Sequence, residues 1–431
     1  MSKKIDLPPK ADNFIDSQRK YGYSFQSALA DIIDNSITAK SRNLNINFFP
    51  GEHSLTILDD GHGMSEKELI DAMVFGSGDP SKPRAPDDLG RFGMGLKSAS
   101  ISQCKKLIVI SRKNQKFSGA IWDVDLIKKT GKWTLEVLNK NDIKKFLTKH
   151  EVEDFDVGTL VIWDNIDSIQ GNAHEQSDEQ NRNVANAKDH LRLTFHRFLE
   201  LKSKPLKIIF NGDNLSPLNP FLEGKSQETS VQQIPIPKTK KYVAMQGYTL
   251  PSISRMSNKQ QKELELDKGF AQTQGFYIYR NKRLISPGGW FGLERYQATT
   301  NLSRVRVDVP NFLDHEWGTD IKKTQMRPPP AILNSMKILL RRFHDPSKKI
   351  YKRKAKKSIE KSKIWLRAEN SIENRLVAQY GIDDKATSYQ SLTKSLNKKQ
   401  SDLLDQLMTD VIEDIPYASI FADYADKKVK Q

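Results

Sequence analysis

Apolar residues near the N-terminus recur at the spacing of one helix face. The repeat covers the segment "ALADIIDNSITA" (28–39) and the residues just before it, and it predicts an amphipathic helix. The positions that follow the i, i+3, i+4, i+7, i+8 spacing are Phe25, Ala28, Leu29, Ile32 and Ile33. A second helix is predicted over "SEKELIDAMVF" (65–75), because Ser65 followed by Glu68 forms a capping box.

Runs with strand character alternate with these helices up to about residue 200. Five strands are predicted over "NLNINFF" (43–49), "HSLTILDD" (53–60), "KLIVIS" (106–111), "FSGAIWDVD" (117–125) and "GTLVIWDNI" (158–166). The polar segment 168–187 is predicted to be a loop, and the helix "KDHLRLTFHRFLELK" (188–202) closes this first unit.

The pattern then changes, and it divides the chain into three parts. Residues 1–205 form the first unit. Residues 206–345 form a second unit that opens on the strand "LKIIFNG", continues with "GFYIYRNKRLI" and "SRVRVDVP", and ends on the helix "AILNSMKILLRRFH". Residues 346–431 show no strand pattern and are predicted to be a basic helical C-terminal region.

Composition and charge narrow the class of protein. The 431 residues are 28% charged and 37% hydrophobic, as expected for a globular protein. No run of about 18 apolar residues and no apolar signal segment occur, so we expect a cytoplasmic protein without a membrane span. The single cysteine, Cys104, excludes an internal disulfide framework and a cysteine-rich metal site.

The formal charge of +16 points to an acidic partner. Nucleic acid is the commonest such partner, because neutralised phosphates release counterions. General solubility would also account for the charge.

Three short stretches carry candidate chemistry, and the first is the pair Asp31 and Asn35. At i and i+4 these residues lie one turn apart on the same side of the predicted helix. A carboxylate and an amide oxygen in this arrangement can hold a water and a hard cation such as Mg²⁺. The same spacing is common on solvated helices, so the pair alone leaves both interpretations open.

The second stretch is "LDDGHGMS" (58–65), a strand end followed by Gly61 and Gly63. Turn chemistry alone explains an aspartate and glycines at such a place. A functional alternative is that Asp60 accepts a hydrogen bond from the exocyclic amine of adenine, while the glycines let a flat base approach the backbone.

The third stretch is "DDLGRFGMGLKSAS" (87–100), in which Gly90, Gly93 and Gly95 lead into a helix. Backbone N–H groups at a helix N-terminus form a cradle for phosphate. The stretch is neither a Walker A loop nor a dinucleotide fingerprint, because its spacing is G-x-x-G-x-G and no strand immediately precedes it.

The three stretches occur in this order within about 70 residues, and Gly158-Thr159 follows at the start of a later strand. In this combination the chain resembles the GHKL ATPase superfamily of gyrase, heat-shock-ninety chaperones, histidine kinases and MutL. The segments "GRFGMGLKSAS" and "GFYIYRNKRLI" most resemble the MORC-type ATPases and their bacterial relatives. The resemblance covers residues 10–340.

The resemblance implies an α+β fold: a Bergerat-type α/β sandwich ATPase domain, an S5-like α/β transducer domain and a helical C-terminal region. It implies ATP and Mg²⁺ as cofactors, with Asn35 coordinating the metal ion, Asp60 binding the adenine amine and Thr159 supporting it. The lid would run from Gly76 to Gly95. The residues assigned to the nucleotide in this way are Asn35, Asp60, Gly61, Gly63, Met64, Gly90, Arg91, Phe92, Gly93, Met94, Gly95, Leu96, Lys97 and Thr159.

Asp31 departs from the family pattern, because most relatives have glutamate at the position of the general base. Aspartate is one methylene shorter, and misplacement of a base by about 1 Å costs roughly a hundredfold in rate. We therefore expect a slow ATPase. Asp34 is expected to cap or pair locally.

In the gyrase and MutL branch, a lysine of the transducer domain reaches the γ-phosphate. The resemblance implies that Lys323 in "DIKKTQMRPPP" has this role, with Lys322 as the alternative; a solvated lysine pair is the other interpretation. The segment Arg280–Trp290 either faces the nucleotide or forms a basic hairpin.

A basic run follows the second unit, with nine basic residues and one acid in the sixteen residues 348–363. We predict that it contacts DNA, although charge runs are usually solvated helix faces. The residues assigned to this contact are Lys348, Lys349, Lys352, Arg353, Lys354, Lys356 and Lys357.

The function predicted from these features is an ATP-dependent homodimer that acts as a clamp or switch on DNA. Genome defence or repair, with a partner nuclease or helicase, would suit such a clamp. The alternatives are an ATP-dependent chaperone or scaffold and a signalling protein of the histidine-kinase branch.

Overall fold

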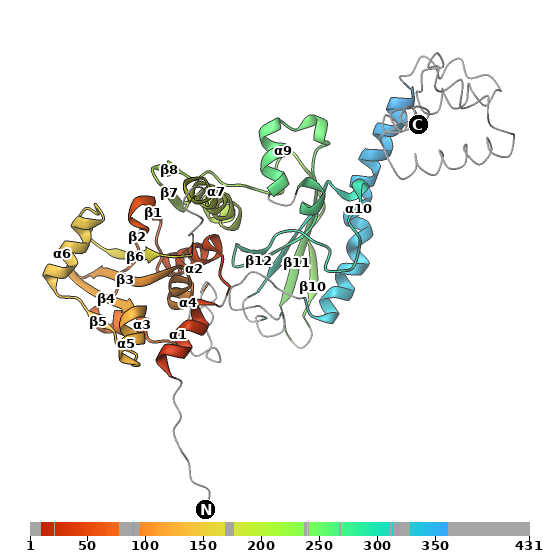
Figure 1. Ribbon diagram of the computed structural model, residues 1–431. Helices are drawn as coiled ribbons and strands as arrows, with labels where there is room; N and C mark the ends of the chain where they lie inside the picture. The colour runs from red at the N-terminus through yellow and green to blue at the C-terminus, as the bar shows by residue number, and fades with distance from the viewer. Residues whose placement is uncertain are drawn as a thin grey trace, which may run out of the picture.

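The computed structural model describes two sheets with their helices (Figure 1). For residues 176–178 and 354–360 it describes the backbone alone. The described residues are 10–20, 22–76, 89, 95–168, 176–236, 239, 241–266, 269–310, 313, 317 and 328–360.

The first unit is built on an eight-stranded mixed sheet. In spatial order its strands are β5 (Glu136–Val137), β4 (Lys116–Asp123), β3 (Cys104–Lys113), β6 (Gly158–Ile166), β2 (Ser54–Asp59), β1 (Asn43–Phe49), β7 (Lys207–Phe210) and β8 (Asp213–Asn214). All neighbours are antiparallel except β1 and β7, which run parallel. The five strands predicted from the sequence pattern are confirmed, and β1 and β2 are joined by the expected short turn at 50–53.

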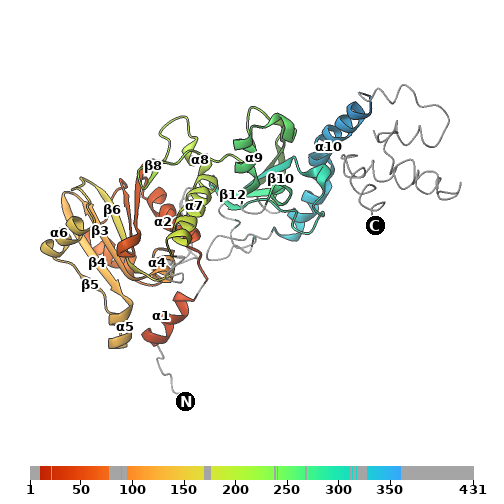
Figure 2. The same cartoon turned by 45° about the horizontal axis from the view of Figure 1, so that its top comes forward.

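Both faces of this sheet are covered, because successive side chains of a strand point to opposite sides. Leu107 and Val109 of β3 face one cluster, while Ile108 and Ile110 face another. The first face packs against several helices, and α6 (Lys140–Lys149) covers the second (Figure 2). The helices on the first face are α1 (Ala11–Arg19), α2 (Phe25–Thr38), α3 (Glu66–Met73), α4 (Gly95–Gln103), α5 (Val124–Thr130), α7 (Gln176–Thr194) and α8 (His196–Leu199).

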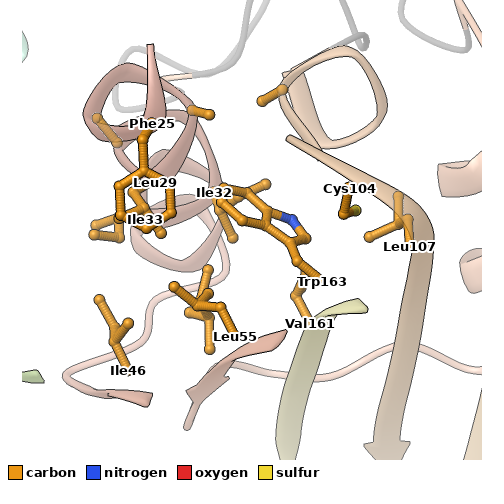
Figure 3. Packing of buried hydrophobic residues seen from close by; sticks show 14 of the residues in the cluster. Phe25, Leu29, Ile32, Ile33, Ile46, Leu55, Cys104, Leu107, Val161 and Trp163 are labelled. Carbon is orange, nitrogen blue, oxygen red and sulfur yellow. The ribbon is translucent and has the colours of Figure 1, made fainter. Parts of the chain in front are cut away.

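The predicted apolar face of α2 is buried against the sheet. Figure 3 shows Ile32 beside Trp163 of β6, with Leu55 of β2 below them. Both Ile32 and Trp163 are at most 1% exposed. Cys104 lies in the same cluster as a small buried side chain. The predicted capping box of α3 is confirmed, since Glu68 accepts from the Ser65 backbone N–H at 2.8 Å.

One prediction for the first unit is wrong. The polar segment 168–187 was predicted to be a loop, but α7 begins at Gln176 within it. Ala187 and Leu191 of α7 are fully buried, and the helix packs against α2. Because only a few apolar residues anchor this helix, its sequence is mostly polar and resembles that of a loop.

The second unit contains a six-stranded sheet. The strand order is β10 (Gln232–Pro235), β11 (Tyr242–Thr249), β14 (Ser303–Val309), β12 (Gly275–Arg280) and β13 (Arg283–Ser286), and β9 (Gln227–Glu228) pairs with β11. β12 and β13 form a hairpin whose turn residues Asn281 and Lys282 both have positive φ, as a type I′ turn requires. α9 (Asn258–Glu265) completes the unit beside this sheet.

Two features of the second unit differ from the sequence prediction. The strand "LKIIFNG" was assigned to it, but β7 pairs with β1 in the first sheet, with Asn43 opposite Lys207. A strand's own pattern does not specify which sheet edge it joins. The strands β9, β10 and β11 were not predicted.

Helix α10 (Pro330–Glu360) packs on the second sheet through Ile332, Met336, Leu340 and Phe343. It continues through Pro346, although the sequence predicted a helix end near residue 345. Buried residues on both sides of the proline hold the helix in place. Residues 361–431 lie outside the described residues, and no described helix is long and apolar enough to span a membrane.

Candidate functional site

Helix α2 presents Asp31 and Asp34 to the interior and Asn35 to the exterior. Ser24 caps the helix by accepting the backbone N–H of Ser27. The side chains of Asp31 and Asp34 are 1% and 0% exposed, whereas Asn35 is exposed. The polar edge of this helix is therefore a buried ionic site with one accessible amide beside it.

Both oxygens of the Asp31 carboxylate face other elements. The Tyr23 hydroxyl donates to Oδ2 at 2.8 Å, and Nη2 of Arg283 lies 3.5 Å from Oδ1. Gly95, the first residue of α4, is close as well, because a Cβ added to it would lie 3.6 Å from Oδ2. The N-terminus of α4, predicted to hold phosphate, thus lies against the predicted general base.

Asp59 occupies the other end of the site, at the last residue of β2. Its Oδ1 accepts the backbone N–H groups of Gly61 at 2.9 Å and Thr159 at 3.2 Å. Its Oδ2 accepts the Ser36 hydroxyl of α2 at 2.7 Å. Burial raises the pKa of Asp59, and the hydrogen bonds from Ser36, Gly61 and Thr159 oppose the rise.

Asp60 points elsewhere. Its Oδ1 accepts the hydroxyl of Ser41 and the backbone N–H groups of Arg42 and Asn43, and its Oδ2 accepts the Asn43 amide. Partial burial raises the pKa of Asp60, but these hydrogen bonds outweigh it and lower the pKa below its usual value. The backbone N–H of Thr159 donates to Asp59, so Thr159 contacts the neighbouring aspartate and not the residue to which the adenine contact was assigned.

A hydrogen-bonded group of main-chain and hydroxyl atoms surrounds Thr159. The Ser111 hydroxyl contacts Thr159 Oγ1 at 2.9 Å and also accepts the Met64 backbone N–H at 2.8 Å. Gly63 has φ +65°, and a Cβ on it would lie 2.0 Å from the Arg112 carbonyl oxygen. Only glycine fits this approach of the two chain segments.

Lys97 lies on the first turn of α4, but it does not face outward. Its ammonium donates to the carbonyls of Ala72 and Val74 at 2.7 Å each, at the end of α3. Burial lowers the pKa of Lys97 to about 8. Since this side chain is 2% exposed and engaged with α3, the predicted contact of Lys97 with the triphosphate is not supported.

Of the remaining predicted site residues, some lie in the described part of the chain and others lie outside it. Gly61 packs closely, with a virtual Cβ only 2.8 Å from Ala39 Cβ, and Leu96 is half-buried on α4. The predicted residues that lie outside the described part of the chain are Gly90, Arg91, Phe92, Gly93, Met94, Lys322 and Lys323.

The predicted DNA-contact residues lie on α10. Lys349, Lys352 and Arg353 are exposed, and Lys348 is half-buried. The side chains of Lys354, Lys356 and Lys357 lie outside the described part of the structure.

Three residues of the site were missed by sequence reasoning: Tyr23, Ser36 and Asp59. Arg283 lies in the segment Arg280–Trp290, which forms a hairpin, but its contact was not predicted. For Asp59 a signal existed, because an Asp-x-Gly-x-Gly motif that ends on Gly61 and Gly63 begins at residue 59. Asp34 was expected to cap or pair locally, and its Oδ1 accepts from Arg283, 249 positions away. Nothing in the local pattern identifies that contact.

A known protein family matches the segment that carries most of this site. Residues 23–159 match the family described as histidine kinase-, DNA gyrase B-, and HSP90-like ATPase. ATPase morc-1 of Caenorhabditis elegans is 31% identical over 114 residues, which cover 26% of this chain and 13% of the relative.

Two mammalian proteins give similar matches. ATPase MORC2B of Mus musculus is 34% identical over 98 residues, 21% of this chain and 9% of the relative. MORC family CW-type zinc finger protein 1 of Homo sapiens is 35% identical over 95 residues, 20% of this chain and 9% of the relative. Each match thus covers a small part of the relative, and the resemblance to GHKL and MORC-type ATPases is confirmed.

Proposed function

We propose that residues 23–159 bind ATP with Mg²⁺ and that the protein hydrolyses it slowly. The observation that carries the proposal is the position of α2. Ser36 joins this helix to Asp59 at the end of β2, and Asp31 of the same helix lies against Gly95 of α4. One helix thus connects a base-recognising carboxylate to a helix N-terminus suited to phosphate.

The polar groups around Asp59 suit the adenine base of a nucleotide. Asp59 retains acceptor capacity beside its three hydrogen bonds and would bind the adenine amine, in place of Asp60. Thr159 would fix this carboxylate, and Gly61, Gly63 and Met64 would line the adenine side.

Asn35 fits Mg²⁺, which is commonly bound by one or two protein oxygens together with substrate phosphates. Its side chain is exposed next to the buried Asp31. The metal ion would supply charge neutralisation at the phosphates. Asp31 would orient the attacking water and accept its proton, which requires hydrogen-bond reach to that water.

We further propose that nucleotide binding joins two copies of the chain into a clamp or switch on DNA. The net charge of +16 and the exposed Lys349, Lys352 and Arg353 on α10 support this proposal. The family description matched over residues 23–159 includes DNA gyrase B, whose name refers to DNA. Genome defence or repair is the setting that such a clamp suits.

Two measurements test the proposal. Titration with ATP and Mg²⁺ should give saturable binding, and absence of binding would refute the nucleotide site. Sizing the full chain with ADP, ATP and a non-hydrolysable analogue, with and without duplex DNA, should give a dimer with ATP or the analogue. A monomer under every condition would contradict the clamp and leave ATP binding to stand.

A further inference from the structure

The β12–β13 hairpin of the second unit reaches the buried carboxylates of α2. Arg283 is the first residue of β13 and follows the turn at Asn281 and Lys282. Its Nε donates to Asp34 Oδ1 at 2.8 Å, and its Nη2 lies 3.5 Å from Asp31 Oδ1. A single guanidinium therefore faces two carboxylates that stand three residues apart on one helix.

This contact is fully enclosed. The side chain of Arg283 is 4% exposed, and those of Asp31 and Asp34 are 1% and 0% exposed. Buried charges of this kind are costly unless they are paired, so the position of each one depends on the others.

Helix α7 and the segment after it close the site from another side. The guanidinium carbon of Arg283 lies 6.0 Å from the centre of the Phe195 ring. Burial together with the charge of Arg283 lowers the pKa of His190 on α7 to about 4, so this histidine is neutral near pH 7. The nearby imidazole therefore adds no positive charge to the site at that pH.

The same hairpin contacts the first unit at a second point. Nη1 of Arg280, the last residue of β12, donates to the carbonyl of Leu89 at 3.1 Å. Arg280 is 3% exposed. The hairpin is thus anchored to the first unit by two buried arginines rather than resting on its surface.

We propose that Arg283 is a positioning residue for the general base Asp31 and couples ATP hydrolysis to the second unit. The inference rests on the proposed function of Asp31. Asp34 anchors the guanidinium through Nε, and this contact directs Nη2 towards Asp31 Oδ1. Tyr23 holds the other oxygen, so the plane of the Asp31 carboxylate is fixed from two elements.

The geometry requires arginine. A planar guanidinium presents several N–H groups in a rigid fork, whereas a lysine ammonium is a compact charge on a flexible stem. Movement of the second unit relative to α2 would withdraw Nη2 from Asp31 and slow hydrolysis. Because Asp31 is shorter than the usual glutamate, its reach to water tolerates little displacement.

The test compares full-length Arg283→Gln and Arg283→Lys with the parental chain and with Lys282→Gln. Lys282 is exposed on the same hairpin and loses the same charge, so it is the matched control. Turnover is measured as kcat, and binding is measured separately with a non-hydrolysable ATP analogue. We expect kcat to fall by about 10- to 100-fold in both Arg283 variants, with the Kd changed less than about threefold. Lys282→Gln should match the parental chain.

A fourth variant separates positioning from folding. Arg283→Gln removes the guanidinium that faces the two buried carboxylates, and Arg283→Gln combined with Asp34→Asn removes one of those negative charges as well. We expect the double variant to regain thermal stability but to keep the low kcat. A parental kcat in the double variant or in Arg283→Lys would overturn the proposal. If the parental chain binds ATP but Arg283 variants hydrolyse it normally, only this inference fails; if the parental chain does not hydrolyse ATP, both fail.

Discussion

The backbone N–H of Thr159 lies 3.2 Å from Oδ1 of Asp59, and this hydrogen bond joins residues 100 positions apart. It connects the end of β2 to the start of β6, where Gly158 approaches Asp59 so closely that a Cβ would lie 1.9 Å from the Asp59 carbonyl oxygen. The carboxylate of Asp59 is consequently held in one orientation, as recognition of a base edge requires.

Asp59→Asn should abolish tight ATP binding. The amide replaces one acceptor oxygen by a donor, and loss of a hydrogen bond to a charged group weakens binding by on the order of 100-fold. Isothermal titration with a non-hydrolysable analogue measures this change. Asp60→Asn is the matched control, because its oxygens are engaged by residues 41–43. If ATP binding is lost in Asp60→Asn but kept in Asp59→Asn, Asp60 and not Asp59 contacts the adenine amine.

Asp31→Asn should preserve ATP binding and remove hydrolysis. An amide cannot accept a proton from water, and loss of a general base lowers kcat by about 100-fold or more. Steady-state phosphate release and analogue binding are measured on the same preparation. Hydrolysis at the parental rate in Asp31→Asn would show that Asp31 is not the base.

Lys97→Met should destabilise the fold. It leaves the carbonyls of Ala72 and Val74 without their donor, at a cost of about 2–3 kcal/mol. Chemical denaturation of the nucleotide-free protein measures the free energy of unfolding. If Lys97 instead contacts phosphate, Lys97→Met would weaken ATP binding while the stability without nucleotide stays unchanged.

Acid should destabilise the protein before carboxylates are protonated. Burial lowers the pKa values of His190, His196 and His344 to about 4 in the folded state. The unfolded chain binds these protons near pH 6.5, so stability is full above that pH and falls as the pH decreases towards 4. Each histidine contributes on the order of 1–2 kcal/mol between pH 7 and 5.

The Tm measured from pH 7.5 to 5 checks this expectation. His344→Phe should flatten the profile, because the ring packs 4.5 Å from the centre of Trp290 and phenylalanine carries no proton-accepting nitrogen. His62→Gln is the control at an exposed position and should leave the profile unchanged. If the parental protein, His344→Phe and His62→Gln give the same dependence of Tm on pH, His344 does not contribute to the acid sensitivity.

Alanine at Lys349, Lys352 and Arg353 together should weaken DNA binding and reduce the dependence of its affinity on salt. Removing one lysine or arginine that neutralises a phosphate reduces the logarithmic salt slope by about 1. The control substitutes Lys144, Lys145 and Lys149 of α6, which are equally basic and exposed. Equal losses of affinity in the two triple variants would indicate a general charge effect, which contradicts a DNA contact on α10.

The sequence by itself determined the elements whose signals are local. The 3.6-residue repeat of Phe25 to Ile33 indicated α2, the Ser65–Glu68 pair indicated the start of α3, and runs of strand-forming residues indicated five strands of the first sheet. Each of these signals is contained in a short stretch of consecutive residues. The order of the candidate motifs also indicated the ATPase resemblance, which the family match over residues 23–159 and the MORC relatives confirm.

Tertiary structure decided which of these residues meet. Asp59 and Asp60 have the same side chain, and in the folded protein they have different partners: Asp59 accepts from Ser36 and Thr159, whereas Asp60 accepts from residues 41–43. The choice of β1 as the partner of β7, and of Arg283 as the partner of Asp34, depends on packing between distant segments. Such contacts leave no periodic trace in the sequence, because their free energy comes from burial and pairing of groups that are neighbours only after folding.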